Sequence, residues 1–256
     1  MNNQEFINRL LKIVSNYKTI YAYGTWGQVL TNNVITNKTK QYSWWYTSSR
    51  QSMLKNLVGK GYYVFDCVGL IKAVLWGWVG NGTVNGGAIY QSNNVPDVSA
   101  NGMIEKCYDV STNMNNITMG EVVWMDGHIG VYYQNGQVIE CSPAFQNKVQ
   151  ITTLSQRQWK KHGKLPYISY SASFLPPRGY FKPGDSGANV EKIDSWLMGW
   201  IPTQVKGDYY GNFTEKCIMA LQQKAKNDGI YNDAIDGCIG NLTLKAMEFY
   251  GFKPYD

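Results

Sequence analysis

Apolar side chains recur along the chain with helical spacing in two places. Residues 2–20 carry them from Phe6 to Tyr17, which indicates an amphipathic helix. Residues 66–75 are mostly apolar after Asp66, a residue type that often caps helices, and they predict a buried helix. Between these two helices the pattern predicts an irregular stretch.

Three later segments have the length and composition of β-strands. Residues 121–125, 128–133 and 137–141 are rich in β-branched and aromatic side chains. The last two flank Asn135-Gly136, which is a strong hairpin signal. Helices followed by antiparallel strands predict an α+β fold.

The hairpin admits two registers, which differ in whether His128 and Glu140 share a face. A two-residue turn pairs Val131 with Glu140 and puts His128 on the opposite face. A three-residue loop with a left-handed Gly136 instead pairs Gly130 with Glu140. His128 and Glu140 then become diagonal neighbours on one face. We prefer this second register because it gathers the apolar side chains of both strands on the other face, and the first stays open.

Residues 171–182 separate two parts of the chain. Pro176-Pro177 lies within this stretch and Pro183-Gly184 directly after it, which predicts a stiff, non-helical connector. We therefore expect one domain over residues 1–170 and a smaller one over residues 183–256.

Three helices are predicted in the smaller domain. The first spans residues 189–197, and the other two begin near Thr214 and Thr243, each a natural N-cap. Both threonines end a Gly-Asn-x-Thr segment, which hints at an internal duplication.

Charge is distributed unevenly along the chain. Residues 1–180 hold 16 Lys and Arg against 8 Asp and Glu, a net charge of +8, whereas residues 181–256 hold 8 against 10, a net charge of −2. A basic surface favours anionic polymers such as nucleic acid, acidic membranes or the bacterial wall. The basic residues are scattered, with Lys160-Lys161 the only adjacent pair, so no nucleic-acid partner is expected.

Other features of the composition exclude further classes. Five Cys without a Cys-x-x-Cys pair and only two His predict neither a disulfide framework nor a metal site, and we expect no cofactor. No apolar run is long enough for membrane insertion. Charged residues interrupt residues 2–20, so we expect no secretory signal. The protein is then made in the cytoplasm, and it would need another release route to reach a bacterial wall.

One set of residues suits nucleophilic catalysis. Cys67 falls in the first turn of the predicted buried helix, where the helix dipole favours a thiolate. His128 can serve as the general base, and Glu140 can orient its ring in the preferred register. Asp126 is the rival for this third position, although it stands before Gly127 as a turn residue would.

The same residues carry a resemblance to a known family. Residues 66–70, Asp-Cys-Val-Gly-Leu, resemble the Asp-Cys-Ser-Gly-Leu signature of the NlpC-type cell-wall peptidases. Residues 119–124 and 127–132 resemble that family's Pro-Gly-Asp-Leu segment and its His-hydrophobic-Gly strand. Residues 21–24 resemble its Tyr-x-Trp-Gly-Gly segment. The resemblance covers roughly residues 5–145, with the Cys and His blocks in the family's order.

This resemblance implies a papain-like fold in which helices pack on an antiparallel sheet. It also implies a Cys67–His128 pair with Glu140 as the third catalytic residue. Tyr23 matches the family's site tyrosine, and we expect it near the oxyanion together with the Cys67 N–H. Asp66 is a further candidate beside the substrate, besides its expected structural part.

The sequence departs from the family pattern at three places. Val68 replaces the usual Ser, and Glu140 replaces the more frequent His, Asn or Gln, a choice nearer to the related CHAP amidases and peptidases. About 40 residues separate Tyr23 from Cys67, far more than is common. Residues 25–62 are therefore candidates for a lid or groove wall, and this difference bears on which bond is cut.

Residues 183–256 resemble the three-helix peptidoglycan-binding domain found beside many wall hydrolases, which implies bacterial peptidoglycan as the partner. The sequence assigns no oligomeric state. We expect a phage endolysin or related autolysin that cleaves an amide bond of the wall stem peptide, foremost as an endopeptidase. The alternatives are an N-acetylmuramoyl-L-alanine amidase, a non-catalytic wall-binding protein with a degenerate papain-like domain, and a papain-like acyltransferase or amidase with another substrate.

Overall fold

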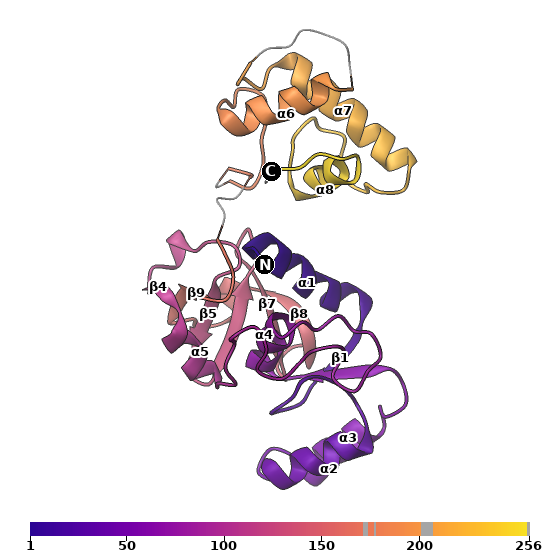
Figure 1. Ribbon diagram of the computed structural model, residues 1–256, viewed down its shortest axis with the longest axis vertical. Coiled ribbons are helices and arrows are strands. Elements are labelled where there is room, and N and C mark those ends of the chain that lie inside the picture. Colours follow the sequence, from indigo (N-terminus) through magenta and orange to yellow (C-terminus); the bar gives the residue numbers. More distant parts are fainter. Residues whose placement is uncertain (171–173, 177, 201–206, 255–256) are drawn as a thin grey trace. The chain divides into compact units, whose positions relative to one another are not determined.

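The computed structural model describes residues 1–170, 174–176, 178–200 and 207–254 (Figure 1). The chain divides into two compact units, Met1–Ser171 and Ala172–Asp256. Each unit has a hydrophobic core of its own.

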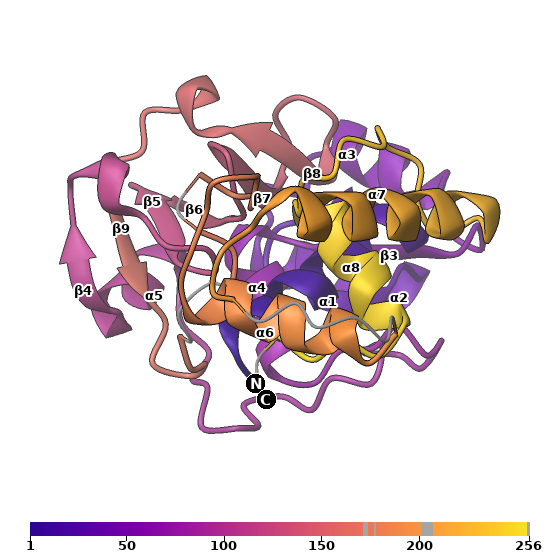
Figure 2. The same ribbon diagram turned by 90° about the horizontal axis from the view of Figure 1, so that it is seen from above.

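The first unit contains two β-sheets. Their strands are β1 (Lys18–Tyr21), β2 (Trp26–Val29), β3 (Tyr62–Phe65), β4 (Tyr108–Ser111), β5 (Val122–Met125), β6 (His128–Tyr132), β7 (Gln137–Ser142), β8 (Lys148–Thr153) and β9 (Lys161–Lys164). The smaller sheet has the order β1-β3-β2, with β1 and β3 parallel. The larger sheet is antiparallel with the order β4-β9-β5-β6-β7-β8, which runs across Figure 2 from one edge to the other.

Helices pack on these sheets. They are α1 (Asn3–Asn16), α2 (Asn32–Gln41), α3 (Ser48–Lys55), α4 (Cys67–Leu75) and α5 (Ala100–Lys106), with two short 3-10 helices, η1 (Met114–Asn116) and η2 (Leu154–Gln156). The amphipathic α1 buries Phe6, Ile7 and Leu10, and every residue of α4 is buried. Because α4 packs against β6 and β7, this unit has the predicted α+β fold, consistent with a papain-like domain.

The hairpin of β6 and β7 adopts the register with the three-residue loop. Val131 pairs with Ile139, and Gly136 is left-handed with a φ of 72°. A Cβ on Gly130 would lie 2.6 Å from the side chain of Val138 and 3.3 Å from the Glu140 Cβ. Glycine is therefore required at this position for the two strands to pair as they do, with Glu140 facing the site.

The sequence pattern predicts an irregular stretch before α4, and this prediction is wrong. The stretch contains the three short strands of the smaller sheet and the helices α2 and α3, which lie together at one end of the unit (Figure 1). The hydroxyls of Thr31 and Thr47 cap these two helices. Each helix buries one residue, Ile35 or Leu54, so neither shows the apolar stripe that predicts a helix.

The second unit contains the three expected helices. They are α6 (Ala188–Met198), α7 (Asn212–Asn227) and α8 (Asn241–Phe249). The predicted N-caps were wrong, because Gly211 and Gly240 cap α7 and α8. Thr214 and Thr243 occupy the third helical position instead, where their buried hydroxyls form hydrogen bonds inside the unit. The two Gly-Asn-x-Thr segments are thus equivalent in position.

The described part of the predicted connector, residues 171–182, packs against the second unit. Of residues 171–182, residues 171–173 and 177 lie outside the described residues. Phe174 and Phe181 are buried in the second core. These aromatic side chains stand beside prolines that suggested an extended linker, but their burial ties the described part of the stretch to the helical unit.

Candidate active site

His128 and Glu140 meet on one face of the larger sheet. His128 begins β6, Glu140 lies in β7, and the His128 Nε2 is 2.5 Å from the Glu140 Oε2. The imidazole is 13% exposed, whereas the carboxylate is fully buried. Because Glu140 holds Nε2, Nδ1 is the ring nitrogen left to exchange a proton with a nucleophile.

Two further side chains hold Glu140 as a carboxylate. Thr152 Oγ1 donates a hydrogen bond of 2.6 Å from β8, and Arg157 Nε lies 2.8 Å from Oε2. Burial raises the pKa of Glu140, but the hydrogen bonds from His128 and these two side chains outweigh it and hold the pKa below its ordinary value. An ionised Glu140 can stabilise the imidazolium that forms when His128 accepts a proton.

Thr152, Arg157 and Trp159 were not identified from the sequence. The Trp159 ring stacks on His128, with 5.6 Å between ring centroids and 18° between planes. Its Nε1 is buried and has no hydrogen-bond partner among the described residues. For Thr152 a signal was available in the sequence. Apolar and polar residues alternate over 148–153, which predicts a strand that could pair with β7.

Cys67 is the first residue of α4, and its thiol is buried against the start of β6. Burial and the Asp66 carboxylate raise the pKa of this thiol to about 12. The backbone N–H groups of Val68, of Cys67 itself and of Ile129, which follows His128, lower it. The start of the helix therefore lowers the pKa of Cys67, as expected, but burial raises this pKa by more. The resting thiol is neutral and needs a base to become a nucleophile.

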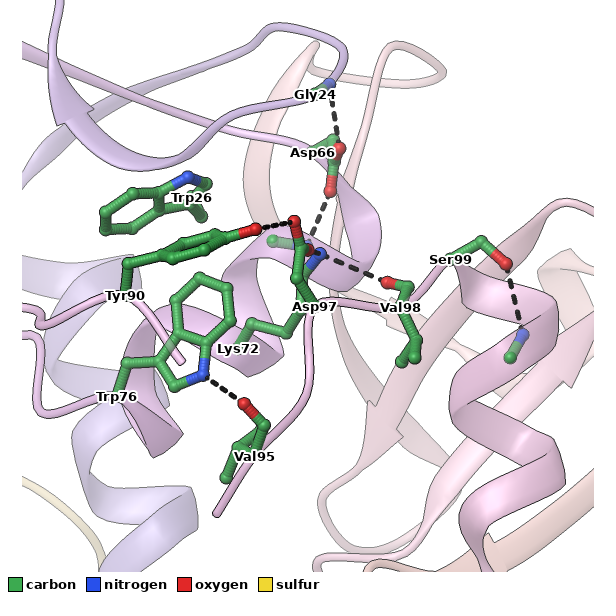
Figure 3. A network of polar contacts seen from close by, with 12 residues as sticks. Gly24, Trp26, Asp66, Lys72, Trp76, Tyr90, Val95, Asp97, Val98 and Ser99 are labelled. Atoms are coloured by element: carbon green, nitrogen blue, oxygen red, sulfur yellow. Dashed lines mark hydrogen bonds and ion pairs between the residues drawn. The ribbon is translucent and has the colours of Figure 1, made fainter. Parts of the chain in front are cut away.

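Asp66 connects the start of α4 to the turn before β2. Its Oδ1 accepts the Gly69 N–H at 2.5 Å, and its Oδ2 accepts the Gly24 N–H at 2.8 Å (Figure 3). Gly24 is left-handed, and a Cβ there would collide with the Tyr42 ring. Both oxygens of Asp66 thus fix the backbone around Cys67, although the side chain also reaches the neighbouring cavity.

A cavity of about 590 Å³ opens beside Cys67. Its walls come from the turn before β2, from α2, from the start of α4 and from the loop that leads into α5. The side chains that line it include Tyr23, Trp26, Lys38, Tyr42, Tyr90 and Asp97. The segment between β2 and β3 therefore forms one wall of the cavity.

An aromatic run in this wall, Trp44-Trp45-Tyr46, lies beside Tyr23. The Tyr23 ring makes edge contacts with Tyr42 at 5.0 Å and with Trp44 at 4.8 Å between centroids. Trp45 and Tyr46 are buried, and the Tyr46 hydroxyl donates a hydrogen bond of 2.8 Å to the Tyr23 carbonyl. Trp44 is 65% exposed. Two members of the run thus anchor the wall while Trp44 faces solvent beside Tyr23.

Two other polar residues have structural partners. Asp126 accepts a hydrogen bond of 2.8 Å from Asn101 Nδ2. His162 is buried in β9, with Nδ1 bonded to Glu121 and Nε2 3.0 Å from the Asn113 carbonyl. The flanking lysines gave this strand the appearance of a polar loop.

A helix that begins with a buried cysteine and packs on a sheet with a His–Glu pair defines a papain-like cysteine hydrolase. Residues 39–165 match the NlpC/P60 family. This match supports an NlpC-type cell-wall peptidase, because the family comprises cysteine peptidases that act on peptidoglycan. The matched range contains Cys67, His128 and Glu140 and begins after Tyr23. A comparison with curated proteins gave no match.

Two further findings concern the described residues alone. They contain no helix that is both long and apolar enough to cross a membrane. Among these same residues, no group of three or more His, Cys, Asp or Glu is arranged to hold a metal ion.

Proposed function

We propose that this protein hydrolyses an amide bond in the stem peptide of bacterial peptidoglycan, with Cys67 as the nucleophile. The observation that carries the proposal is the buried Glu140 carboxylate, which holds His128 through Nε2 and leaves Nδ1 for the thiol. The family matched by residues 39–165 supports the substrate class. The cavity beside Cys67 has a volume typical of ligand sites.

In the proposed reaction, His128 Nδ1 takes the thiol proton as the Cys67 sulfur attacks the scissile carbonyl. The Cys67 N–H, with the Tyr23 hydroxyl as a second donor, stabilises the negative charge on the carbonyl oxygen. His128 then gives the proton to the leaving amine, the C–N bond breaks and a thioester forms. Water, deprotonated by His128, cleaves the thioester to a carboxylic acid and restores the thiol.

Within this class we place endopeptidase activity first. The alternative is an N-acetylmuramoyl-L-alanine amidase, because Glu140 at the third position resembles the CHAP amidases and peptidases. Both reactions proceed through the same attack on an amide carbonyl, so the bond is decided by what the cavity binds.

We further propose that the second unit binds the wall and that the protein acts there as an endolysin of phage type, after release from the cytoplasm. The three helices of this unit and its likeness in sequence to peptidoglycan-binding domains support the proposal. Residues 181–256 have a net charge of −2, so binding would depend on shape and hydrogen bonds rather than on bulk charge.

Digestion of purified peptidoglycan, followed by mass spectrometry of the released fragments, tests these proposals. We expect the wild type to release fragments, and Cys67→Ala to bind the wall without releasing any. Cleaved stem peptides would identify an endopeptidase, and free lactyl carboxyls on muramic acid would identify an amidase. If the wild type and Cys67→Ala both bind and neither releases fragments, the protein is a wall-binding protein and the proposed activity is wrong.

A further inference from the structure

The cavity beside Cys67 is lined by both acids and bases. Its charged side chains are Lys38, Asp66, Lys72 and Asp97. Asp66 already accepts two backbone N–H groups, from Gly24 and Gly69. Its carboxylate is therefore already held by hydrogen bonds within the protein.

Lys72 and Asp97 satisfy each other. They form an ion pair in the wall of the cavity, where Lys72 projects from α4, as Figure 3 shows. Lys72 Nζ also donates to the Val98 carbonyl at 3.1 Å, and the Tyr90 hydroxyl donates to the second oxygen of Asp97 at 2.8 Å. Neither member of this pair has an unbalanced charge to offer to a ligand.

Lys38 differs from the other three charged residues. It is half-buried on α2, with Nζ 3.2 Å from the Gln41 Oε1 and 5.6 Å from the centroid of the Tyr42 ring. Both of these partners are neutral. In the part of the chain that the structure describes no carboxylate is in ion-pair contact with Lys38, and Asp66 and Asp97 attract its ammonium only from a greater distance. A half-buried ammonium beside a cavity is stabilised by an anion that enters that cavity.

We propose that Lys38 binds a carboxylate of the substrate peptide and makes the enzyme prefer stem peptides in which this carboxylate is free. The inference rests on the proposed hydrolase function. Lys38 lies on α2, the helix that follows β2, and residues 39–41 at the end of this helix already belong to the range that matches the family.

A pair of synthetic stem peptides gives the test. One carries a free α-carboxylate on its γ-linked D-glutamyl residue, and the other carries the amide at the same place. KM and kcat are measured for the wild type, Lys38→Gln and Lys40→Gln. Lys40 lies on the same helix but is exposed and outside the cavity lining, so its variant removes an equal charge without touching the site.

The wild type and Lys40→Gln should show a KM about tenfold lower for the carboxylate peptide than for the amide peptide. Lys38→Gln should bring this ratio close to one, through a higher KM for the carboxylate peptide. The inference is overturned if Lys38→Gln keeps the wild-type ratio. This includes a variant that raises KM for both peptides by the same factor, because the lysine would then only support the wall.

Binding to Cys67→Ala separates this inference from the proposed function. Calorimetry with the same two peptides, with and without Lys38→Gln, measures the preference when no hydrolysis occurs. A carboxylate preference in Kd that depends on Lys38 supports the inference even if the wild type cleaves neither peptide, and in that case the proposed function fails. Equal Kd values for the two peptides overturn the inference.

Discussion

The two histidines of the chain each pair with a glutamate on the larger sheet, at two separate places. His162 is 3% exposed and uses both ring nitrogens, Nδ1 for Glu121 and Nε2 for the Asn113 carbonyl. His128 gives only Nε2 to Glu140 and is partly exposed. The first pair has no ring nitrogen left for chemistry, whereas the second has one.

What the second ring nitrogen faces therefore decides the role of each pair. The strand that begins with His128 contacts the thiol of Cys67 through the N–H of Ile129, and a cavity opens at the same thiol. The His162 ring is held between Glu121, which directly precedes β5, and Asn113, the N-cap of η1. The same two residue types thus form a structural pair at one place and a candidate acid–base pair at the other.

The largest effect that separates the pairs is expected for His128→Ala. Removing the general base should lower kcat on a stem peptide about a thousandfold. The fold should persist, because Glu140 keeps its bonds from Thr152 and Arg157. Steady-state kinetics and thermal unfolding check both statements. A variant with near-normal kcat would remove His128 from the mechanism.

His162→Ala should show the opposite behaviour. It leaves the buried Glu121 without its imidazole partner, which should lower the free energy of unfolding by about 3–5 kcal/mol. Denaturant titration measures this loss, and kcat per folded molecule should stay near the wild-type value. Replacing both partners, with His162→Phe and Glu121→Leu, should recover much of the stability. The comparison breaks down if His162→Ala lowers kcat as much as His128→Ala does.

A smaller effect is expected at Arg157, which positions Glu140. Arg157→Gln removes one of the hydrogen bonds that hold the pKa of Glu140 below its ordinary value, so this pKa should rise. As the solution is acidified, Glu140 of the variant would become protonated at a higher pH than in the wild type. Activity should therefore also be lost at a higher pH. At neutral pH we expect kcat to fall about tenfold.

The pH profile of kcat/KM distinguishes this positioning role from simple loss of structure. Lys160→Gln is the matched control, because Lys160 is an exposed cation on the same segment. An Arg157→Gln variant whose acidic limb coincides with that of the wild type would show that Arg157 does not tune Glu140.

The last prediction concerns the reactivity of the thiol itself rather than turnover. Burial raises the pKa of Cys67 to about 12, so in His128→Ala the alkylation rate of this thiol by iodoacetamide should rise about tenfold for each pH unit, without a plateau through the mildly alkaline range. Mass spectrometry of the Cys67 peptide follows the rate. A plateau near neutral pH would mean that the helix start alone makes a stable thiolate.

The sequence predicted those parts of the site that depend on local signals. Asp66 before an apolar run predicts the start of α4 with Cys67 in its first turn, and the Asn135-Gly136 turn predicts the hairpin that brings His128 to Glu140. In both places the structural signal and the chemical residues lie within a few positions of each other. The α+β fold follows from the same elements.

The parts that the sequence did not predict depend on contacts between distant segments. Arg157 reaches Glu140 across the β7–β8 hairpin, and Trp159 stacks on His128 although they are far apart in the chain. The helix α2 supplies Lys38 to the cavity but buries a single residue. The sequence therefore shows no helical spacing of apolar residues there. Burial of His162 was hidden because Lys160 and Lys161 before it and Lys164 after it give the segment the composition of a polar loop.

The central claim is that the thiol of Cys67 carries out the chemistry. It is tested most directly by the initial rate of fragment release from purified peptidoglycan by Cys67→Ala, measured beside Cys107→Ala. Cys107 is a partly buried thiol of the same unit whose Sγ contacts the Met103 carbonyl at 3.3 Å, away from the cavity lining. We expect Cys107→Ala to release fragments at the wild-type rate and Cys67→Ala to release none above background. Release by Cys67→Ala at a rate close to that of Cys107→Ala would contradict the account.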